Sequence, residues 1–178
     1  MMTQNRPLAS DYAPYYAKYI QQVPDGDFLE TLESQPAKMN SLFGSLNEKQ
    51  GDSRYAPGKW SVKEVFGHIN DTERVFSYRL LRIGRGDQTP LPGFEQDDYV
   101  KTANSAARTL ASLLEEFHAI RRSSASLIRS LDDASWFRRG TASGKEISAL
   151  ALAFIIAGHA IHHQVILEQR YLPALPAS

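Results

Sequence analysis

Apolar side chains recur at helical spacing over four long segments of this chain, and this pattern limits the fold more than any other feature. Within each segment they fall three and four residues apart, as one face of an α-helix requires. Glycine and proline mark the connections between the segments. No strand-like alternation, internal repeat or low-complexity stretch interrupts this order. The segments span residues 27–46, 61–83, 105–131 and 148–172.

This pattern predicts an all-α fold, a four-helix bundle. The 178 residues suit one domain with a core of useful size, so we expect a single domain over residues 1–178 with an N-terminal lead-in over residues 1–26. Residues 11–23 of the lead-in are rich in tyrosine and predict a short helix or an aromatic stretch. This stretch either packs on its own bundle or covers a partner subunit, and the second alternative predicts a homodimer.

Several helix ends are marked by local sequence. Ser61 and Glu64 have the spacing of a capping box at the start of the second helix, and glycines after residue 83 predict its end. Ser148 is the predicted N-cap of the fourth helix. Pro36 lies inside the first segment, where we expect a kink or a break into two pieces.

The connection after the second helix is unusually long. Residues 86–103 are expected to be irregular, and a stretch of about 20 residues can run the length of a bundle. The length favours a long crossover between helices two and three. In that topology the second and third helices are parallel, and the fourth is antiparallel to the second.

Charge and composition exclude several kinds of partner. Lys+Arg and Asp+Glu number 20 each, so nothing indicates nucleic-acid binding. The absence of cysteine excludes disulfides and thiolate metal sites, which leaves histidine and carboxylate as metal ligands. No apolar run approaches the roughly 18 residues that span a bilayer, and the N-terminus lacks a signal-peptide pattern. We therefore expect a cytoplasmic protein with no membrane partner.

Three of the five histidines lie within five residues of the fourth segment. His159 and His163 are four residues apart and fall on its apolar, inward face, whereas His162 lies at the margin of that face. Two imidazoles at this spacing can bind one transition-metal ion. The alternative is a pair of core histidines that bond to neighbouring helices.

The third ligand is sought on another helix. His68 lies two turns into the second helix, at a depth that matches His159 and His163 in the crossover topology. His118 has charged neighbours and is expected to face water. Asp71, one turn beyond His68, could orient an imidazole or be an ordinary exposed acid. Glu73 falls on the apolar face, which predicts a buried ion pair with an arginine of another helix.

Three stretches resemble the DinB/YfiT superfamily. They are residues 55–68 (YAPGKWSVKEVFGH), 90–94 (PLPGF) and 157–163 (AGHAIHH), and the likeness extends over about residues 35–172. The resemblance implies a left-handed four-helix bundle. It also implies a divalent metal, often nickel or zinc, held by one histidine of the second helix and two of the fourth. The matching positions are His68, His159 and His163.

Members of this superfamily use low-molecular-weight thiols such as bacillithiol or mycothiol in S-transfer or maleylpyruvate isomerisation. The leading hypothesis is therefore a metalloenzyme that transfers such a thiol to a small electrophilic substrate. A metal-dependent hydrolase is the first alternative, with Asp71 or an acid among residues 95–98 as base. A non-catalytic bundle that binds metal or a ligand is the second. The sequence assigns no catalytic residue.

Overall fold

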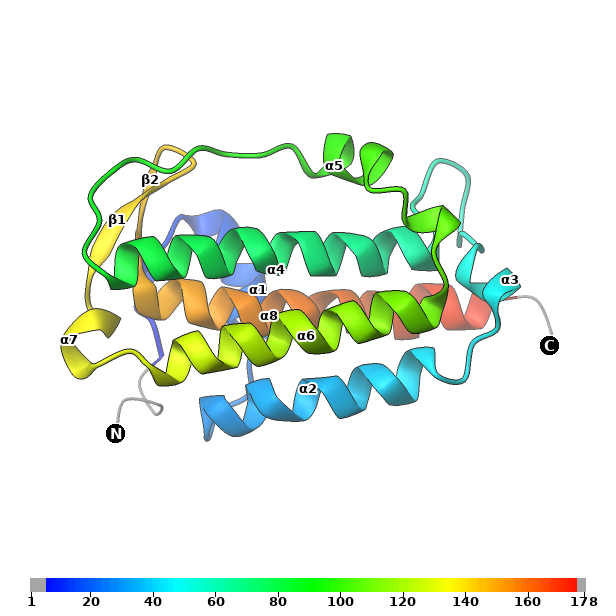
Figure 1. The fold of residues 1–178 in the computed structure, drawn as a ribbon, viewed down its shortest axis with the longest axis horizontal. Coiled ribbons are helices and arrows are strands. Elements are labelled where there is room, and N and C mark those ends of the chain that lie inside the picture. The colour runs from blue at the N-terminus through cyan, green and yellow to red at the C-terminus, as the bar shows by residue number, and fades with distance from the viewer. Residues whose placement is uncertain (1–5, 176–178) are drawn as a thin grey trace.

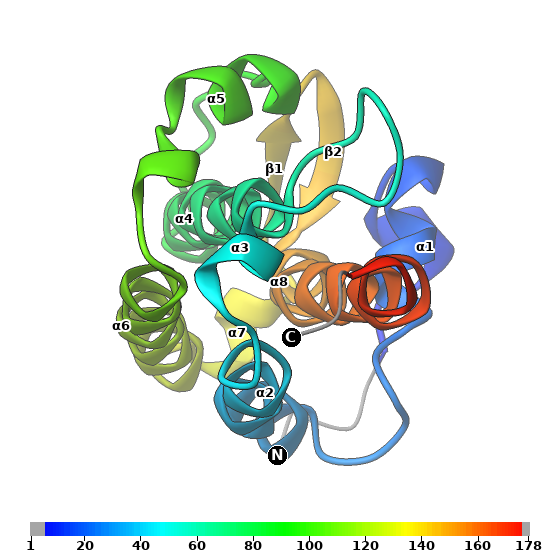
Figure 2. The same ribbon diagram turned by 90° about the vertical axis from the view of Figure 1, so that its right-hand side faces the viewer.

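Four long helices form the bundle of this computed structural model, which describes residues 6–175. They are α2 (Phe28–Phe43), α4 (Val62–Gly84), α6 (Leu110–Arg129) and α8 (Ala149–Ile166). In the end-on view of Figure 2 they occupy the corners of a square, with α4 between α6 and α8. The predicted four-helix bundle is confirmed.

The direction of the helices follows the predicted crossover. Figure 1 shows α4 and α6 running the same way, with α2 and α8 running against them. The chain between α4 and α6 returns along the whole bundle, as its length indicated. This connection contains the helix α5 (Gln96–Thr102), so the expectation that residues 86–103 are irregular was wrong there. A 3-10 turn (Ser105–Ala107) follows. The third helix begins at Leu110, where Thr109 caps it, rather than at residue 105.

Two short strands contradict the expectation that the chain has none. β1 (Arg139–Ala142) and β2 (Lys145–Ser148) form an antiparallel hairpin. Both turn residues have positive φ, 53° at Ser143 and 71° at Gly144, as the tightest hairpin turns require. Strands of four residues are too short for alternation to be read from the sequence. Leu91 of the crossover adds a parallel bridge to this hairpin.

The N-terminal lead-in packs on its own bundle. Its short helix α1 (Ala17–Ile20) lies beside α8 (Figure 2). The backbone approach is so close that a Cβ atom on Gly158 would lie 2.1 Å from the Tyr19 carbonyl oxygen. Because only glycine allows this contact, residue 158 places Tyr19 directly over the histidines of α8. The remaining elements are α3 (Glu48–Gly51), α7 (Asp133–Trp136) and 3-10 turns at Ala9–Asp11, Pro14–Tyr16 and Leu172–Ala174.

The first helix of the bundle continues through Pro36 without a break, contrary to one of the two outcomes expected there. Proline has no N–H, so the carbonyl of Leu32 loses its donor within the helix. The guanidinium of Arg121 donates to that carbonyl at 3.4 Å. Arg121 also forms a two-pronged ion pair with Glu73, at 2.9 and 2.7 Å. The predicted buried pair of Glu73 is confirmed.

The last helix is the core of the bundle. Ser148 caps it as predicted, and it extends through a π-helical turn, Leu167–Tyr171. Residues Ala149–Ala174 are long and apolar enough to cross a membrane by length and composition, so the expectation that no segment reaches that length was wrong. Two thirds of its most apolar window (67%) is nevertheless buried by the rest of the bundle. An apolar surface on all sides is what a central core helix requires.

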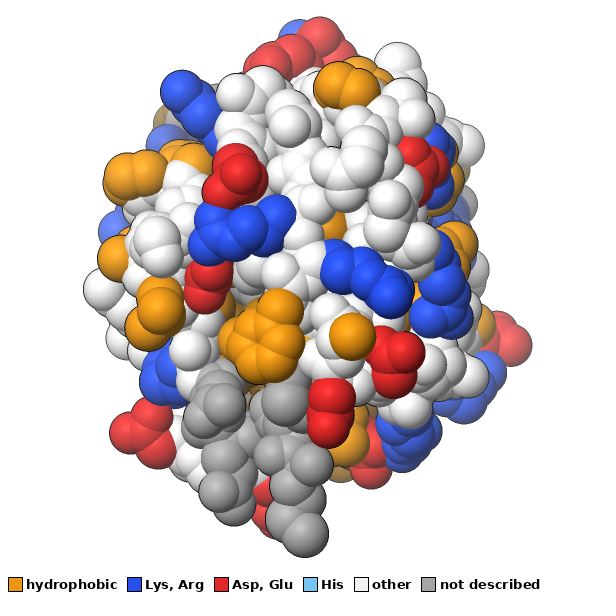
Figure 3. Space-filling model, turned by 90° about the vertical axis from the view of Figure 1, so that its left-hand side faces the viewer, with side chains coloured by type: hydrophobic (Ala, Val, Ile, Leu, Met, Phe, Trp, Pro, Cys, Tyr) orange, Lys and Arg blue, Asp and Glu red, His pale blue; other side chains and the backbone are white. Residues whose placement is uncertain are grey.

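The surface at the hairpin end of the bundle carries charges of both signs. Figure 3 shows acidic and basic side chains interspersed with isolated apolar ones over this end. The view contains no extended patch of one sign on the described residues, which agrees with the balanced composition.

Candidate metal centre

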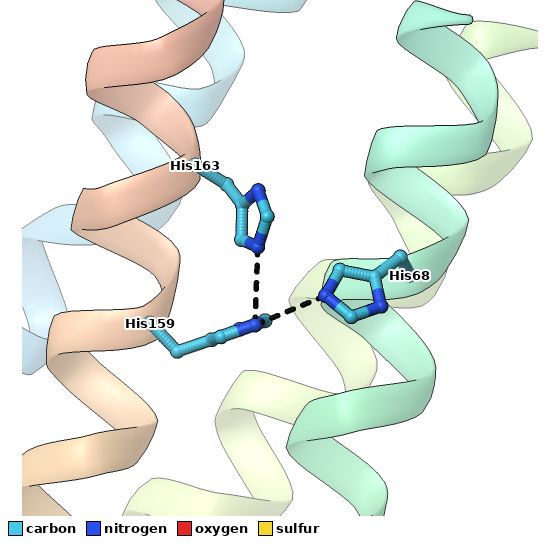
Figure 4. Close-up of side chains that lie close together, drawn as sticks. All are labelled: His68, His159 and His163. Carbon is cyan, nitrogen blue, oxygen red and sulfur yellow. Dashed lines mark hydrogen bonds between the residues drawn. The ribbon is translucent and has the colours of Figure 1, made fainter. Parts of the chain in front are cut away.

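Three imidazoles converge between α4 and α8. His68 projects from α4, His159 and His163 project from α8, and the rings point toward one another (Figure 4). The Nε2 atom of His159 lies 3.1 Å from the Nε2 atoms of both His68 and His163. All three ligand atoms lie within 4.8 Å of one another. The residues that sequence spacing singled out are thus brought together from positions 91 residues apart.

This geometry fits a divalent ion. Nitrogens bound to one tetrahedral zinc ion at about 2.0–2.1 Å lie roughly 3.3 Å from each other. The two shortest nitrogen separations are close to that value. Three protein ligands leave a further position for water or substrate, which is the arrangement of catalytic zinc sites. The site therefore suits Zn²⁺ or Ni²⁺, both of which accept imidazole ligands.

Burial keeps the cluster neutral. His68 and His159 are almost fully buried, and His163 is half-buried. Burial lowers the pKa of His68 to about 4, with a smaller contribution from His162. Burial likewise holds the pKa values of His159 and His163 well below their usual range, helped by the neighbouring histidines. At neutral pH each ring therefore has a free lone pair to offer a metal.

Thr72 fixes the orientation of His68. Its Oγ1 lies 3.3 Å from the Nδ1 of His68, one helical turn away. With a metal on Nε2, Nδ1 would carry the proton, and this N–H would donate a hydrogen bond to the Thr72 hydroxyl oxygen. Thr72 was not predicted from the sequence, although its spacing of four residues from His68 was the available signal. Asp71, the residue predicted for this role, has its carboxylate 3.5 Å from the guanidinium of Arg74 instead.

Aromatic rings close the cluster on several sides. The Trp60 ring lies 4.8 Å from the His68 ring, and Tyr19 lies 5.2 Å from His159. Phe76 lies 6.2 Å from His159 on its other flank. These rings lower the polarity around the imidazoles, which strengthens any charge interaction at the centre.

The other two histidines stand outside the cluster. His162 lies at the margin, as predicted, and its Nδ1 is 3.0 Å from the Nε2 of Gln22. His118 of α6 was expected to face water. It is only half-buried, but its Nε2 is enclosed without a hydrogen-bond partner among the described residues. The expectation for His118 was therefore wrong for that atom.

Two cavities open on the cluster. One, of about 380 Å³, is lined by His159, Phe76 and the tyrosines of the lead-in. The other, of about 340 Å³, is lined by His163 and Trp60. Glu95 lines the first cavity and Asp97 the second, so the crossover brings one acid to each. Small-molecule sites are cavities of this size with a few polar groups.

Comparison with known proteins identifies the family of this chain. A model of the DinB superfamily matches residues 31–167, well over half of the chain. The chain belongs to the DinB superfamily. A Bacillus subtilis relative named "Putative metal-dependent hydrolase YfiT" is 28% identical over 143 residues, covering 76% of this chain and 78% of the relative. A Geobacillus kaustophilus relative with the same description is 22% identical over 139 residues, covering 77% and 78%.

Two solved structures show the same fold. That of Bacillus subtilis YfiT, described as "a probable metal-dependent hydrolase with an unusual four-helix bundle topology", gives a TM-score of 0.74 at 19% identity. It covers 96% of this chain and 93% of YfiT. A mycothiol-dependent maleylpyruvate isomerase gives a TM-score of 0.64 at 12% identity, over 78% of this chain and 58% of the isomerase. At these identities the likeness establishes the bundle of DinB proteins, not a shared reaction.

Acid should destabilise the metal-free protein through these histidines. Their folded pKa values lie below the value of about 6.5 for an unfolded chain, so the unfolded state binds more protons. The stability that the neutral histidines contribute is complete above a pH of about 6.5. It is lost as the pH falls toward about 4, the pKa of His68. Urea unfolding at several pH values should show a steeper acid loss for the wild type than for His159→Gln. Equal pH dependence of the two proteins would contradict this account.

Proposed function

We propose that this DinB protein is a divalent-metal enzyme that transfers a low-molecular-weight thiol to a small electrophile. The observation that carries the proposal is the pair of cavities on the histidine cluster, one at His159 and one at His163. Two reactants can reach one centre through separate openings. A hydrolase needs space for one organic substrate and a water molecule, whereas a transferase needs space for two organic reactants.

His68, His159 and His163 would hold the ion, with Thr72 orienting the first of them. A bound Zn²⁺ or Ni²⁺ supplies a lowered pKa for a thiol or water at its open position. The aromatic rings beside the histidines lower the polarity around the reacting atoms. Glu95 or Asp97, one at each cavity, would accept the proton that the nucleophile loses.

Metal-dependent hydrolysis is the second candidate, favoured by the names of the relatives. In that reaction a water molecule replaces the thiol, and the acid of one cavity serves as base. The histidine cluster would serve either reaction. The two differ in whether product forms without an added thiol.

The test uses the purified protein, first stripped of metal by a chelator and then reloaded with Zn²⁺ or Ni²⁺. An aryl chloride is offered with bacillithiol, mycothiol or glutathione, and an activated ester is offered without a thiol. In the transfer reaction the sulfur–carbon bond forms, the carbon–chlorine bond breaks and the thiol proton leaves. We expect conjugation with at least one thiol. The reloaded protein should react at least about tenfold faster than the metal-free protein, a smaller factor than the rate gain that general-base catalysis alone provides.

Each other result rejects the proposal in a defined way. Ester hydrolysis without conjugation would replace transfer by the hydrolase. A chelated protein that unfolds, and that shows no reaction when reloaded, would favour a structural metal in a non-catalytic bundle. A chelated protein that stays folded, together with a reloaded protein that is inactive on both substrates, would favour a ligand-binding role.

A further inference from the structure

Arg79 is a buried cation without an acidic partner. Three cationic side chains are buried among the described residues, and two of them are neutralised. Lys63 pairs with Glu48 and Asp52, and Arg121 pairs with Glu73. Arg79 is equally enclosed, with 2% of its surface exposed, yet no carboxylate of the described residues lies within ion-pair distance. A buried charge without a counter-ion is costly to maintain.

Only part of the Arg79 guanidinium is used by the fold. Its Nη2 donates to the Pro92 carbonyl at 2.7 Å and to the Ser143 hydroxyl at 3.0 Å. Nε and Nη1 make no hydrogen bond with the described residues. The rings of Phe76 and Phe94 lie 5.7 and 5.8 Å from its central carbon. The group is thus held in place at one nitrogen, while its remaining N–H groups stay available to a ligand.

Arg79 also belongs to the lining of the cavity at the metal centre. Arg79 and His159 line the same space of about 380 Å³. His68, Thr72, Phe76 and Arg79 follow one another at helical spacing along one face of α4. Arg79 lies eleven positions beyond His68, which corresponds to about 16.5 Å along the helix axis. Side chains of a helix tilt toward its N-terminus, so the guanidinium extends back toward the histidines and Phe76 lies between them.

We propose that Arg79 binds the carboxylate of a substrate whose reacting end lies at the three histidines. The inference rests on the proposed function for the reacting end, but not for the anion site. A guanidinium presents parallel N–H donors that match the two oxygens of a carboxylate. The ligand supplies the missing counter-charge. Substrates are therefore small acids that carry the carboxylate several bonds from the reacting atom.

Glu95 does not fill this role. It lines the same cavity, but its side chain is exposed at the start of α5 and forms no ion pair with Arg79. Arg79 also anchors the crossover to the hairpin turn through Pro92 and Ser143. That anchoring uses Nη2 alone and needs no charge, since a neutral donor could make the same bonds. It therefore leaves the choice of a buried cation unexplained.

The experiment separates the anion site from the metal. Nickel-loaded protein is titrated with mercaptohexanoate and mercaptohexanol, and with the shorter mercaptopropionate and mercaptopropanol. The thiolate-to-nickel absorption band reports binding at the metal. We expect one acid of the two to bind at least about tenfold more tightly than its alcohol, as one charge-assisted hydrogen bond implies. Arg79→Met should abolish this preference, while Arg85→Met, at the exposed C-cap of the same helix, should retain it.

A second measurement needs no metal. Hexanoate should raise the Tm of the metal-free wild type more than hexanamide does, and it should not do so for Arg79→Met. Equal affinity of the wild type for acids and alcohols would overturn the anion site. This holds even if the thiolate-to-nickel band shows that thiols bind at the metal. Absence of the band, with hexanoate stabilisation that depends on Arg79, would reject thiol binding and uphold the anion site. If Arg79→Met does not fold, the wild-type comparisons and Arg79→Lys decide, since lysine keeps the charge but not the forked geometry.

Discussion

Arg121→Met should lower the free energy of unfolding by about 3–5 kcal/mol, because it leaves the Glu73 carboxylate buried and unpaired. Both side chains are almost fully buried, at 2% and 3% exposure. The two-pronged pair joins α6 to α4 in the centre of the bundle. Urea unfolding at neutral pH measures the loss. Arg122→Met is the matched control, since Arg122 is exposed on the same helix, and it should change stability by less than about 0.5 kcal/mol.

A double variant identifies the cause of the loss. Arg121→Met with Glu73→Leu removes both charges, so it should be more stable than Arg121→Met alone. The opposite order would show that packing of the arginine, not the unpaired carboxylate, sets the cost. The Leu32 carbonyl gives a further check, because Arg121 donates to it where Pro36 cannot. Pro36→Ala should therefore stabilise Arg121→Met more than it stabilises the wild type.

The sequence was sufficient for the long helices and their order. Their apolar spacing, the Ser61 capping box and the length of the crossover all act locally or through simple geometry, and the structure agrees with each. The unbroken helix at Pro36 could not be predicted from the neighbouring residues. A proline inside a helix normally frees a carbonyl, but here an arginine 89 positions away donates to it. Such tertiary compensation has no local signal.

The histidine cluster was predictable for the same reason. A spacing of four residues places His159 and His163 on one face, and the topology sets the depth of His68. The parts that were missed depend on loops. The hairpin, α5 and the burial of Arg79 follow from how the crossover folds back over α4. In the sequence, an arginine near a charged helix end is typical of a solvated residue. In the structure, Pro92 and Ser143 contact Arg79 and it is buried.

Replacing any one of the three clustered histidines should weaken metal binding, and this is the largest effect expected at the site. Wild-type protein should bind close to one divalent ion per chain. His68→Ala, His159→Ala and His163→Ala should each weaken binding by more than about 100-fold, since loss of an outer hydrogen-bond partner alone costs 10–100-fold. Thr72→Val removes such a partner of His68. It should weaken metal binding by a factor within that smaller range. Elemental analysis and competition with a chelator of known affinity measure these differences.

His162→Ala is the control, because His162 neighbours the cluster in sequence but interacts with Gln22 instead. It should keep the full metal content. Circular dichroism of each variant must show the helical fold, so that lost metal reflects a lost ligand rather than unfolding. Full metal content in any one of the three ligand variants would remove that histidine from the site. Metal loss in His162→Ala as well would mean that the ion binds at the partly buried margin of α8 where His162 lies, and not between α4 and α8 where the three histidines converge.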